Sequence, residues 1–109
     1  MTTSKVEQIR TLNDRLRQNL STGIGTAVIT TGVAAFGVEA VAGIVKTIAV
    51  YDDFCHGNDP YEEHDFGSFD VDGHTVFFKI DLYEEPNVKS ANGEPVVTRV
   101  LTIMLANEY

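Results

Sequence analysis

The sequence predicts an α+β fold, a two-layer sandwich in which two helices cover an antiparallel β-meander in the order α-β-α-β-β-β. Three observations favour it: two segments with apolar residues at helical spacing, an alternating hairpin around Asp72-Gly73, and a long β-branched run near the C-terminus. The length of 109 residues suits a single domain spanning residues 1–109.

The first helix is expected to begin at Ser4. Ser4-Lys-Val-Glu7 has the form of a capping box, in which the serine hydroxyl accepts a hydrogen bond from the Glu7 N–H. Apolar residues then recur at helical spacing, at Val6, Ile9, Leu12, Leu16 and Leu20. We expect Arg10 and Asp14, four residues apart, to pair on the outer side, and the helix to end at Ser21 to Gly25.

A short strand and a second helix follow. Thr26 to Thr31 is rich in β-branched residues, which predicts a strand, and residues 33–37 are expected to turn. Val38 to about Phe54 predicts a helix whose apolar face holds Val41, Ile44, Val45 and Ile48. Cys55 continues that stripe, so we expect its side chain to be buried.

The hairpin has a defined register. Asp-Gly is the pair that a two-residue type I′ turn favours, and with Asp72-Gly73 as the turn Val71 pairs with His74. The core face then holds alternate residues, among them Phe69, Val71, Val76, Phe78 and Ile80. Glu84 to Pro95 has the proline and glycine content of a loop, and Val96 to Ala106 predicts a central strand that closes the meander.

The charge is unevenly distributed. The net charge is −8, but residues 1–51 hold five bases against three acids, whereas residues 52–109 hold three bases against thirteen acids. Eleven of those acids lie between Asp52 and Glu85, where Lys79 is the only base. This argues against direct nucleic-acid binding, which needs a basic surface. The acid-dense segment must be solvated, loaded with metal or facing a basic partner, and Glu62, Glu84 and Glu85 are candidate partner-binding residues in expected loops.

The segment from Tyr51 to Gly67 concentrates side chains that bind transition metals. The hairpin register places His64 opposite Asp81 on the face away from the core, with Cβ atoms about 4.5–5.5 Å apart. Two interpretations stay open: a hydrogen bond that orients the ring, or two ligands of one divalent metal. Zinc is the first candidate, with manganese and calcium as alternatives. Asp59 and Asp53 would complete the site.

Other features bound the class of protein. One cysteine cannot form an internal disulfide, and the polar N-terminal residues are not expected to form a signal peptide, which favours a cytoplasmic location. The apolar stretch Val33 to Tyr51 contains two charged residues and is too short for a membrane span. Neighbouring Cys55 and His56 point in different directions, so no nucleophile–base pair is expected. We therefore expect a noncatalytic protein, with a metal-dependent hydrolase as the alternative.

Several segments together resemble a family of small bacterial proteins classed only as a domain of unknown function. These are Asp52-Asp-Phe54, Asn58-Asp-Pro-Tyr61, Glu63-His-Asp-Phe-Gly67, Lys79-Ile-Asp81 and Thr98 to Ala106 with Glu108-Tyr109. The resemblance extends from Ile9 to Tyr109, although the family pattern does not usually contain Cys55-His56 and often has Gly at position 62.

The family that the chain resembles often lies on plasmids, phages and other mobile elements, and the resemblance implies no established activity. Small acidic proteins of mobile elements are often inhibitors of host defence. By analogy, the resemblance implies an anti-CRISPR type of inhibitor. Such a protein would bind a host defence nuclease stoichiometrically, at a basic channel, and block its access to nucleic acid.

Overall fold

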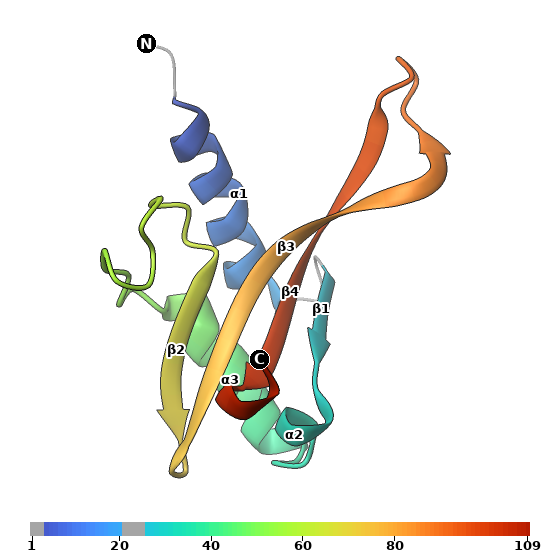
Figure 1. The fold of residues 1–109 in the computed structure, drawn as a ribbon. Helices are drawn as coiled ribbons and strands as arrows, with labels where there is room; N and C mark the ends of the chain where they lie inside the picture. The colour runs from blue at the N-terminus through green and yellow to red at the C-terminus, as the bar shows by residue number, and fades with distance from the viewer. Residues whose placement is uncertain (1–3, 21–25) are drawn as a thin grey trace.

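The computed structural model describes residues 4–20 and 26–109, and it confirms the α+β class (Figure 1). The predicted helix end at Ser21 to Gly25 lies outside the described residues. A short helix occupies part of the segment expected to turn. Along the chain the elements are α1 (Lys5–Gln18), β1 (Thr26–Ile29), α2 (Thr31–Ala34), α3 (Val38–Val50), β2 (Phe66–Val71), β3 (His74–Lys89), β4 (Pro95–Leu105) and the 3-10 helix η2 (Ala106–Glu108).

The strands form one mixed sheet in the order β1-β4-β3-β2. Strands β2, β3 and β4 are the predicted antiparallel meander, and β1 joins it parallel to β4. The predicted register is confirmed, because Val71 pairs with His74 and Phe66 with Lys79. The turn between them has φ of 49° at Asp72 and 82° at Gly73, which is the left-handed backbone that a type I′ turn requires.

Helices α1 and α3 cover one face of the sheet (Figure 1). The core between the layers combines helix and strand residues, among them Leu16, Ile44, Ile48, Val76, Phe78, Ile80, Leu101 and Ile103. The predicted core face of the hairpin is therefore confirmed at its centre. In the part of the chain that the structure describes, every helix is too short or too polar to cross a membrane.

A glycine allows the first strand of the hairpin to pack closely on this core. A Cβ atom at Gly67 would collide with the Phe78 ring and come within 2.6 Å of Tyr51 Cε1. Side chains essentially never approach so closely, so only glycine fits where β2 passes these two aromatic rings.

The two main helices begin and end for local reasons. Ser4 caps α1 as predicted, since its hydroxyl accepts a hydrogen bond of 3.1 Å from the Glu7 N–H. Helix α3 ends at Val50, earlier than expected, where Arg17 of α1 donates to the Ile48 and Tyr51 carbonyls at 2.7 and 3.1 Å. These bonds satisfy carbonyls that another helical turn would otherwise use. The prediction that Cys55 continues the buried stripe is wrong, because it lies beyond the helix and is exposed.

The largest departure from the expected fold is a projecting arm. The segment 84–95 was expected to be a loop, but β3 continues to Lys89 and β4 begins at Pro95. Pairing with β2 ends at Lys79 and pairing with β1 begins at Val100, so residues 82–99 form a two-stranded arm that pairs with no other strand of residues 4–20 and 26–109. Figure 1 shows the arm leaving the body at the same end as the beginning of α1.

The C-terminal segment, with the 3-10 helix η2, contacts the start of α2 at the end of the fold away from the arm (Figure 1). The Glu108 carboxylate accepts hydrogen bonds from the Thr30 hydroxyl at 2.6 Å, the Leu105 N–H at 2.9 Å and the Gly32 N–H at 3.1 Å. These bonds, that of Thr30 above all, hold the pKa of Glu108 below its usual value.

Candidate functional site

Residues 51–65, which connect α3 to β2 and are called the motif loop below, carry most of the predicted site residues. Their own polar groups fold the loop. Asn58 accepts a hydrogen bond from the Cys55 N–H at 3.0 Å and donates to the Asp53 carbonyl at 3.1 Å. The Asp59 N–H donates to the Cys55 carbonyl at 2.7 Å. The Asn-Asp pair of the motif is thus used first to build a tight turn.

The Asp59 carboxylate fixes the second half of the loop. Its Oδ1 atom accepts from the Glu63 and His64 N–H groups at 3.0 and 3.1 Å, and only 5% of the residue is exposed. Glu62 and His64 have φ of 58° and 56°, in the left-handed region that costs energy for residues other than glycine. The two charge-assisted bonds that the Asp59 carboxylate accepts offset that cost.

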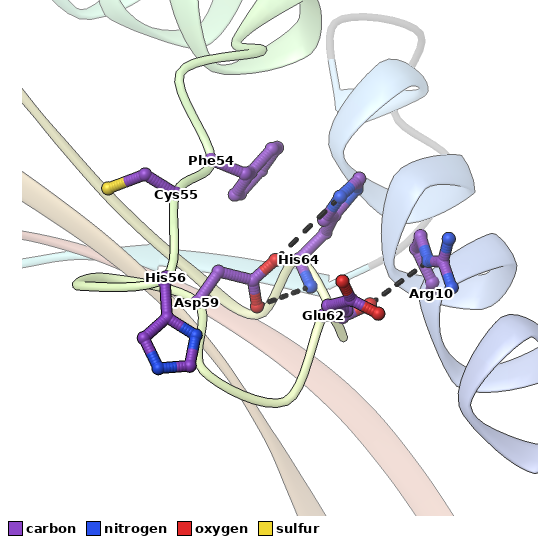
Figure 2. A pocket seen from close by; sticks show the side chains of 7 residues that line it. All are labelled: Arg10, Phe54, Cys55, His56, Asp59, Glu62 and His64. Carbon is purple, nitrogen blue, oxygen red and sulfur yellow. Dashed lines mark hydrogen bonds and ion pairs between the residues drawn. The ribbon is translucent and has the colours of Figure 1, made fainter.

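His64 lies between two carboxylates. Its Nδ1 atom is 2.9 Å from Asp14 Oδ1 on α1, and its Nε2 atom is 3.7 Å from Asp59 Oδ2, the contact drawn in Figure 2. The ring also stacks on Phe54, with ring centres 3.9 Å apart and an angle of 3°. Asp14 contacts Arg17 at 2.7 Å, and the Arg17 guanidinium carbon lies 5.0 Å from the Phe54 ring centre. Together these residues fasten the motif loop to α1.

A pocket of about 220 Å³ opens beside His64 (Figure 2). Arg10 borders it and donates a hydrogen bond from Nε to the Glu62 carbonyl at 3.0 Å. Figure 2 shows Cys55 and His56 extending away from His64. The volume is below the roughly 300–1,000 Å³ of most small-molecule sites. The pocket therefore presents an imidazole, a carboxylate and a guanidinium to a small group rather than enclosing a whole ligand.

Of the four predicted metal ligands, the structure brings together Asp59 and His64. Asp53 is exposed, and it is its backbone carbonyl that accepts hydrogen bonds from Asn58 and from the Tyr51 hydroxyl. Asp81 lies on the sheet face away from the helices, with Oδ2 3.1 Å from Lys79 Nζ. Within residues 4–20 and 26–109, no group of three or more His, Cys, Asp and Glu side chains is arranged to hold a metal ion.

The expected pairing of His64 with Asp81 is wrong, although the register that suggested it is right. The ladder of β2 and β3 ends at Phe66 and Lys79, followed by one backbone bond of 2.8 Å from the Ile80 N–H to the Asp65 carbonyl. At His64 the positive φ turns the chain out of the strand, so its ring contacts α1 instead.

Two residues of the site were missed because their partners are remote in the sequence. Asp14 was expected to pair with Arg10, but Asp14 contacts Arg17 and His64 while Arg10 contacts the motif loop. Arg17 is 3% exposed. The sequence does contain a signal for this, because Arg17 lies beside Leu16 on the apolar face of α1. An arginine at such a position is expected to be buried, and a buried arginine needs polar partners.

Acidic groups near the start of β2 influence one another. Partial burial raises the pKa of the Asp65 carboxyl, and the nearby charges of Asp59 and Asp81 raise it further, against a hydrogen bond with its own N–H. The base in this region is also affected: the hydrogen bond with Asp81 and the negative charge of Asp81 raise the pKa of Lys79. This region therefore carries a negative potential that Lys79 offsets mainly at Asp81.

The candidate partner-binding residues are accessible. Glu62 in the motif loop and Glu84 and Glu85 on the arm are all exposed, and Glu85 also accepts a hydrogen bond of 2.6 Å from the Thr98 hydroxyl. The arm is a strand pair rather than the expected loop, and Glu84 pairs with Val97 across it.

Comparison with known proteins identifies one family. No curated protein and no solved structure matches the chain. A family model for a protein of unknown function, DUF3768, matches residues 29–108, which include the motif loop, the hairpin and the arm. This match covers well over half of the 109 residues, and the chain therefore belongs to the DUF3768 family.

Proposed function

We propose that this protein is a noncatalytic inhibitor that binds a host defence nuclease, in the manner of an anti-CRISPR protein, and blocks its access to nucleic acid. The observation that carries the proposal is the excess of exposed acids in the segment 52–85, in which Lys79 is the only base. Seven acids of the segment 52–85 are exposed: Asp52, Asp53, Glu62, Asp70, Asp72, Glu84 and Glu85.

Four of the eight bases are engaged in contacts of their own. Arg17 is buried, Arg10 bonds to a motif-loop carbonyl, and Lys79 pairs with Asp81. Arg99 donates a hydrogen bond of 2.7 Å to Asn13 Oδ1. The acidic charge is thus presented to solvent, where it attracts a basic surface.

A nucleic-acid channel is such a basic surface, because it must bind phosphates. An acidic protein that occupies it competes with the nucleic acid for the same lysines and arginines. Electrostatic complementarity of this kind speeds association and makes binding sensitive to salt. Inhibition should accordingly be stoichiometric, and a cytoplasmic location follows from the proposed partner.

The proposal can be tested with purified CRISPR nucleases and restriction endonucleases in cleavage assays. We expect one equivalent of the protein to suppress cleavage, and added salt to weaken the inhibition. Changing Glu62, Glu84 and Glu85 to lysine should weaken it at least tenfold. The matched control changes Glu7, Glu39 and Glu94, which are exposed acids outside the segment 52–85, to lysine with the same change in net charge, and it should retain more of the inhibition. Full suppression at substoichiometric amounts would indicate an enzyme instead.

One observation favours a second candidate, a divalent metal site that could serve a metal-dependent hydrolase. Asp14 holds Nδ1 of His64 while Nε2 faces Asp59. A carboxylate on the remote ring nitrogen is the usual arrangement behind a metal-binding histidine. We propose zinc as the metal, with His64 and Asp59 as ligands and Asp81 and Asp53 outside this pair.

Elemental analysis after zinc supplementation and dialysis tests the metal. We expect about one zinc per chain, lost in His64→Ala but retained in the control His74→Ala, whose ring lies at the hairpin turn. Chelation should then lower the melting temperature. If the protein is still free of metal after supplementation, the proposed zinc site is wrong, and so is the proposed metal-dependent hydrolase.

A further inference from the structure

The beginning of α1 and the arm diverge from the same end of the body (Figure 1). Residues of both elements line a pocket of about 140 Å³, called the arm groove below. It is lined by three segments that are remote in the sequence: Ile9 and Asn13 of α1, Glu63 and Asp65 before β2, and Ile80, Leu82 and Arg99 of the β3–β4 hairpin.

The arm groove combines apolar walls with two carboxylates. Ile9, Ile80 and Leu82 form the apolar part, and Leu82 is 59% exposed. Arg99 is held by Asn13, and no ion pair joins it to Glu63 or Asp65 in the part of the chain that the structure describes. The charges that act most on the pKa of Asp65 are those of two further carboxylates, Asp59 and Asp81.

The volume limits what can enter. About 140 Å³ exceeds the roughly 30 Å³ share of one water molecule but is well below the 300–1,000 Å³ of drug-sized ligand sites. This is room for one long side chain. A side chain with an apolar stem and a cationic head would contact the walls and the carboxylates at once.

We propose that the arm groove receives an arginine side chain of a protein partner, with the aliphatic stem against Ile9, Ile80 and Leu82 and the guanidinium paired with Glu63 and Asp65. Arginine fits better than lysine because its planar guanidinium can bond to carboxylates in a bidentate manner. The inference deepens the proposed function, on which it rests for the identity of the partner. Arginines that contact phosphates in a nucleic-acid channel are the side chains this groove would capture.

The arm supports this assignment independently of the carboxylates. A two-stranded hairpin is at best marginally stable by itself. Yet this one exposes three large apolar side chains, with Leu82 at 59%, Tyr83 at 51% and Val97 at 51% exposure, and Leu82 lines the groove itself. A partner segment seated between α1 and the arm would cover Leu82 and Val97, which share the face toward the helices by strand alternation.

A titration of isotope-labelled protein with the peptide acetyl-Leu-Arg-Leu-amide, followed by NMR, tests the groove without a nuclease. We expect saturable shifts of the Ile9, Asn13, Ile80, Leu82 and Arg99 amides at millimolar peptide, and at least tenfold weaker binding of acetyl-Leu-Gln-Leu-amide. Shifts that are absent, or equal for both peptides, would overturn the proposal. A dimer in sedimentation together with concentration-dependent shifts of these amides without peptide would also overturn it, because a second copy would then be the occupant.

Matched variants separate this inference from the proposed function. Leu82→Ser, and Glu63→Gln with Asp65→Asn, should each weaken arginine-peptide binding about tenfold or more. The controls Val38→Ser, and Asp52→Asn with Asp72→Asn, change residues outside the groove and should bind normally. If the groove variants inhibit the nuclease as well as the unchanged protein does, the arm groove does not bind the nuclease, but the proposal of an inhibitor stands. If the protein binds the arginine peptide normally but inhibits none of the nucleases, the proposal of an inhibitor is wrong, but arginine binding in the groove stands.

Discussion

The motif loop and the arm use polar residues in opposite ways. In the motif loop, the side chains that define the family resemblance bond to the loop itself, as Asn58 and Asp59 do, or to α1, as His64 does. In the arm, Glu84 and Glu85 are exposed beside exposed apolar side chains, and no other strand in the described part of the chain pairs with the two arm strands. The dense motif here serves the fold, whereas the exposed side chains of the arm have no such use within the described residues, and the arm is therefore where we propose that a partner binds.

The largest loss of stability is expected when a core residue that packs against the motif loop is truncated. Phe78 is fully buried, and its ring centre lies 5.2 Å from that of Tyr51 and 6.4 Å from that of Phe54. Phe78→Ala should therefore lower the free energy of unfolding by about 3–5 kcal/mol, measured by urea denaturation. Phe77→Ala, on the opposite and less buried face of the same strand, is the control and should lower it by less. Equal losses would contradict the assignment of the core face.

A smaller loss is expected when the loop loses its anchor. Asp59→Ala removes the acceptor of two backbone N–H groups, and bonds to a charged group contribute about 1.5–3 kcal/mol each. We expect a loss of about 2 kcal/mol or more, with Asp59→Asn milder because an amide oxygen still accepts. Asp53→Ala should change the stability by less than about 0.5 kcal/mol, since its side chain is exposed. A stable Asp59→Ala variant would mean that the motif serves binding rather than folding.

These contrasts explain what could be predicted from the sequence. The hairpin register followed from local information, namely the Asp72-Gly73 turn and the alternation on each side of it. The motif-loop contacts did not, because a positive φ at His64 redirects its ring and the partner Asp14 is 50 residues away. Alternation predicts a face only while the strand continues.

The arm was missed for another reason. Its proline, glycine and acidic residues are loop signals, yet pairing across the hairpin continues from Leu82 with Arg99 to Glu84 with Val97 and, after a register shift, to Lys89 with Pro95. Turn-forming residues near a hairpin tip are compatible with either structure. Only the backbone pairing distinguishes an extended arm from a loop.

The C-terminal closure should depend on pH. Hydrogen bonds lower the pKa of Glu108 in the folded state, so its ionised form stabilises the fold above the unfolded pKa. That contribution should be lost as the pH falls through the lower, folded pKa. Glu108→Gln should thus reduce the melting temperature at pH 7 and have little effect at strongly acidic pH. Glu94→Gln, at the exposed arm tip, is the control. If the difference in melting temperature between the unchanged protein and Glu108→Gln does not depend on pH, the charge of Glu108 does not stabilise the C-terminal segment.

Asp65 should show the reverse dependence. Burial and neighbouring carboxylates raise its folded pKa, so its ionised form destabilises the fold at pH 7, and this penalty disappears below the unfolded pKa. Asp65→Asn should therefore raise the melting temperature slightly at neutral pH and leave it unchanged at strongly acidic pH. A lower melting temperature at pH 7 would mean that Asp65 serves the fold, as the motif loop does, and not the arm groove.

The smallest effect on stability is expected in the arm. Leu82 and Val97 are 59% and 51% exposed, so Leu82→Ser and Val97→Ser should each change the free energy of unfolding by no more than about 0.5 kcal/mol. Arm amides should also exchange with solvent faster than those of paired β2 and β3, because the arm opens without unfolding the sheet. Urea denaturation and hydrogen exchange measure both quantities. A loss above about 1.5 kcal/mol in either variant would show that the arm is part of the cooperative core. In that case its exposed side chains would be needed for folding, and their value as evidence for a partner would disappear.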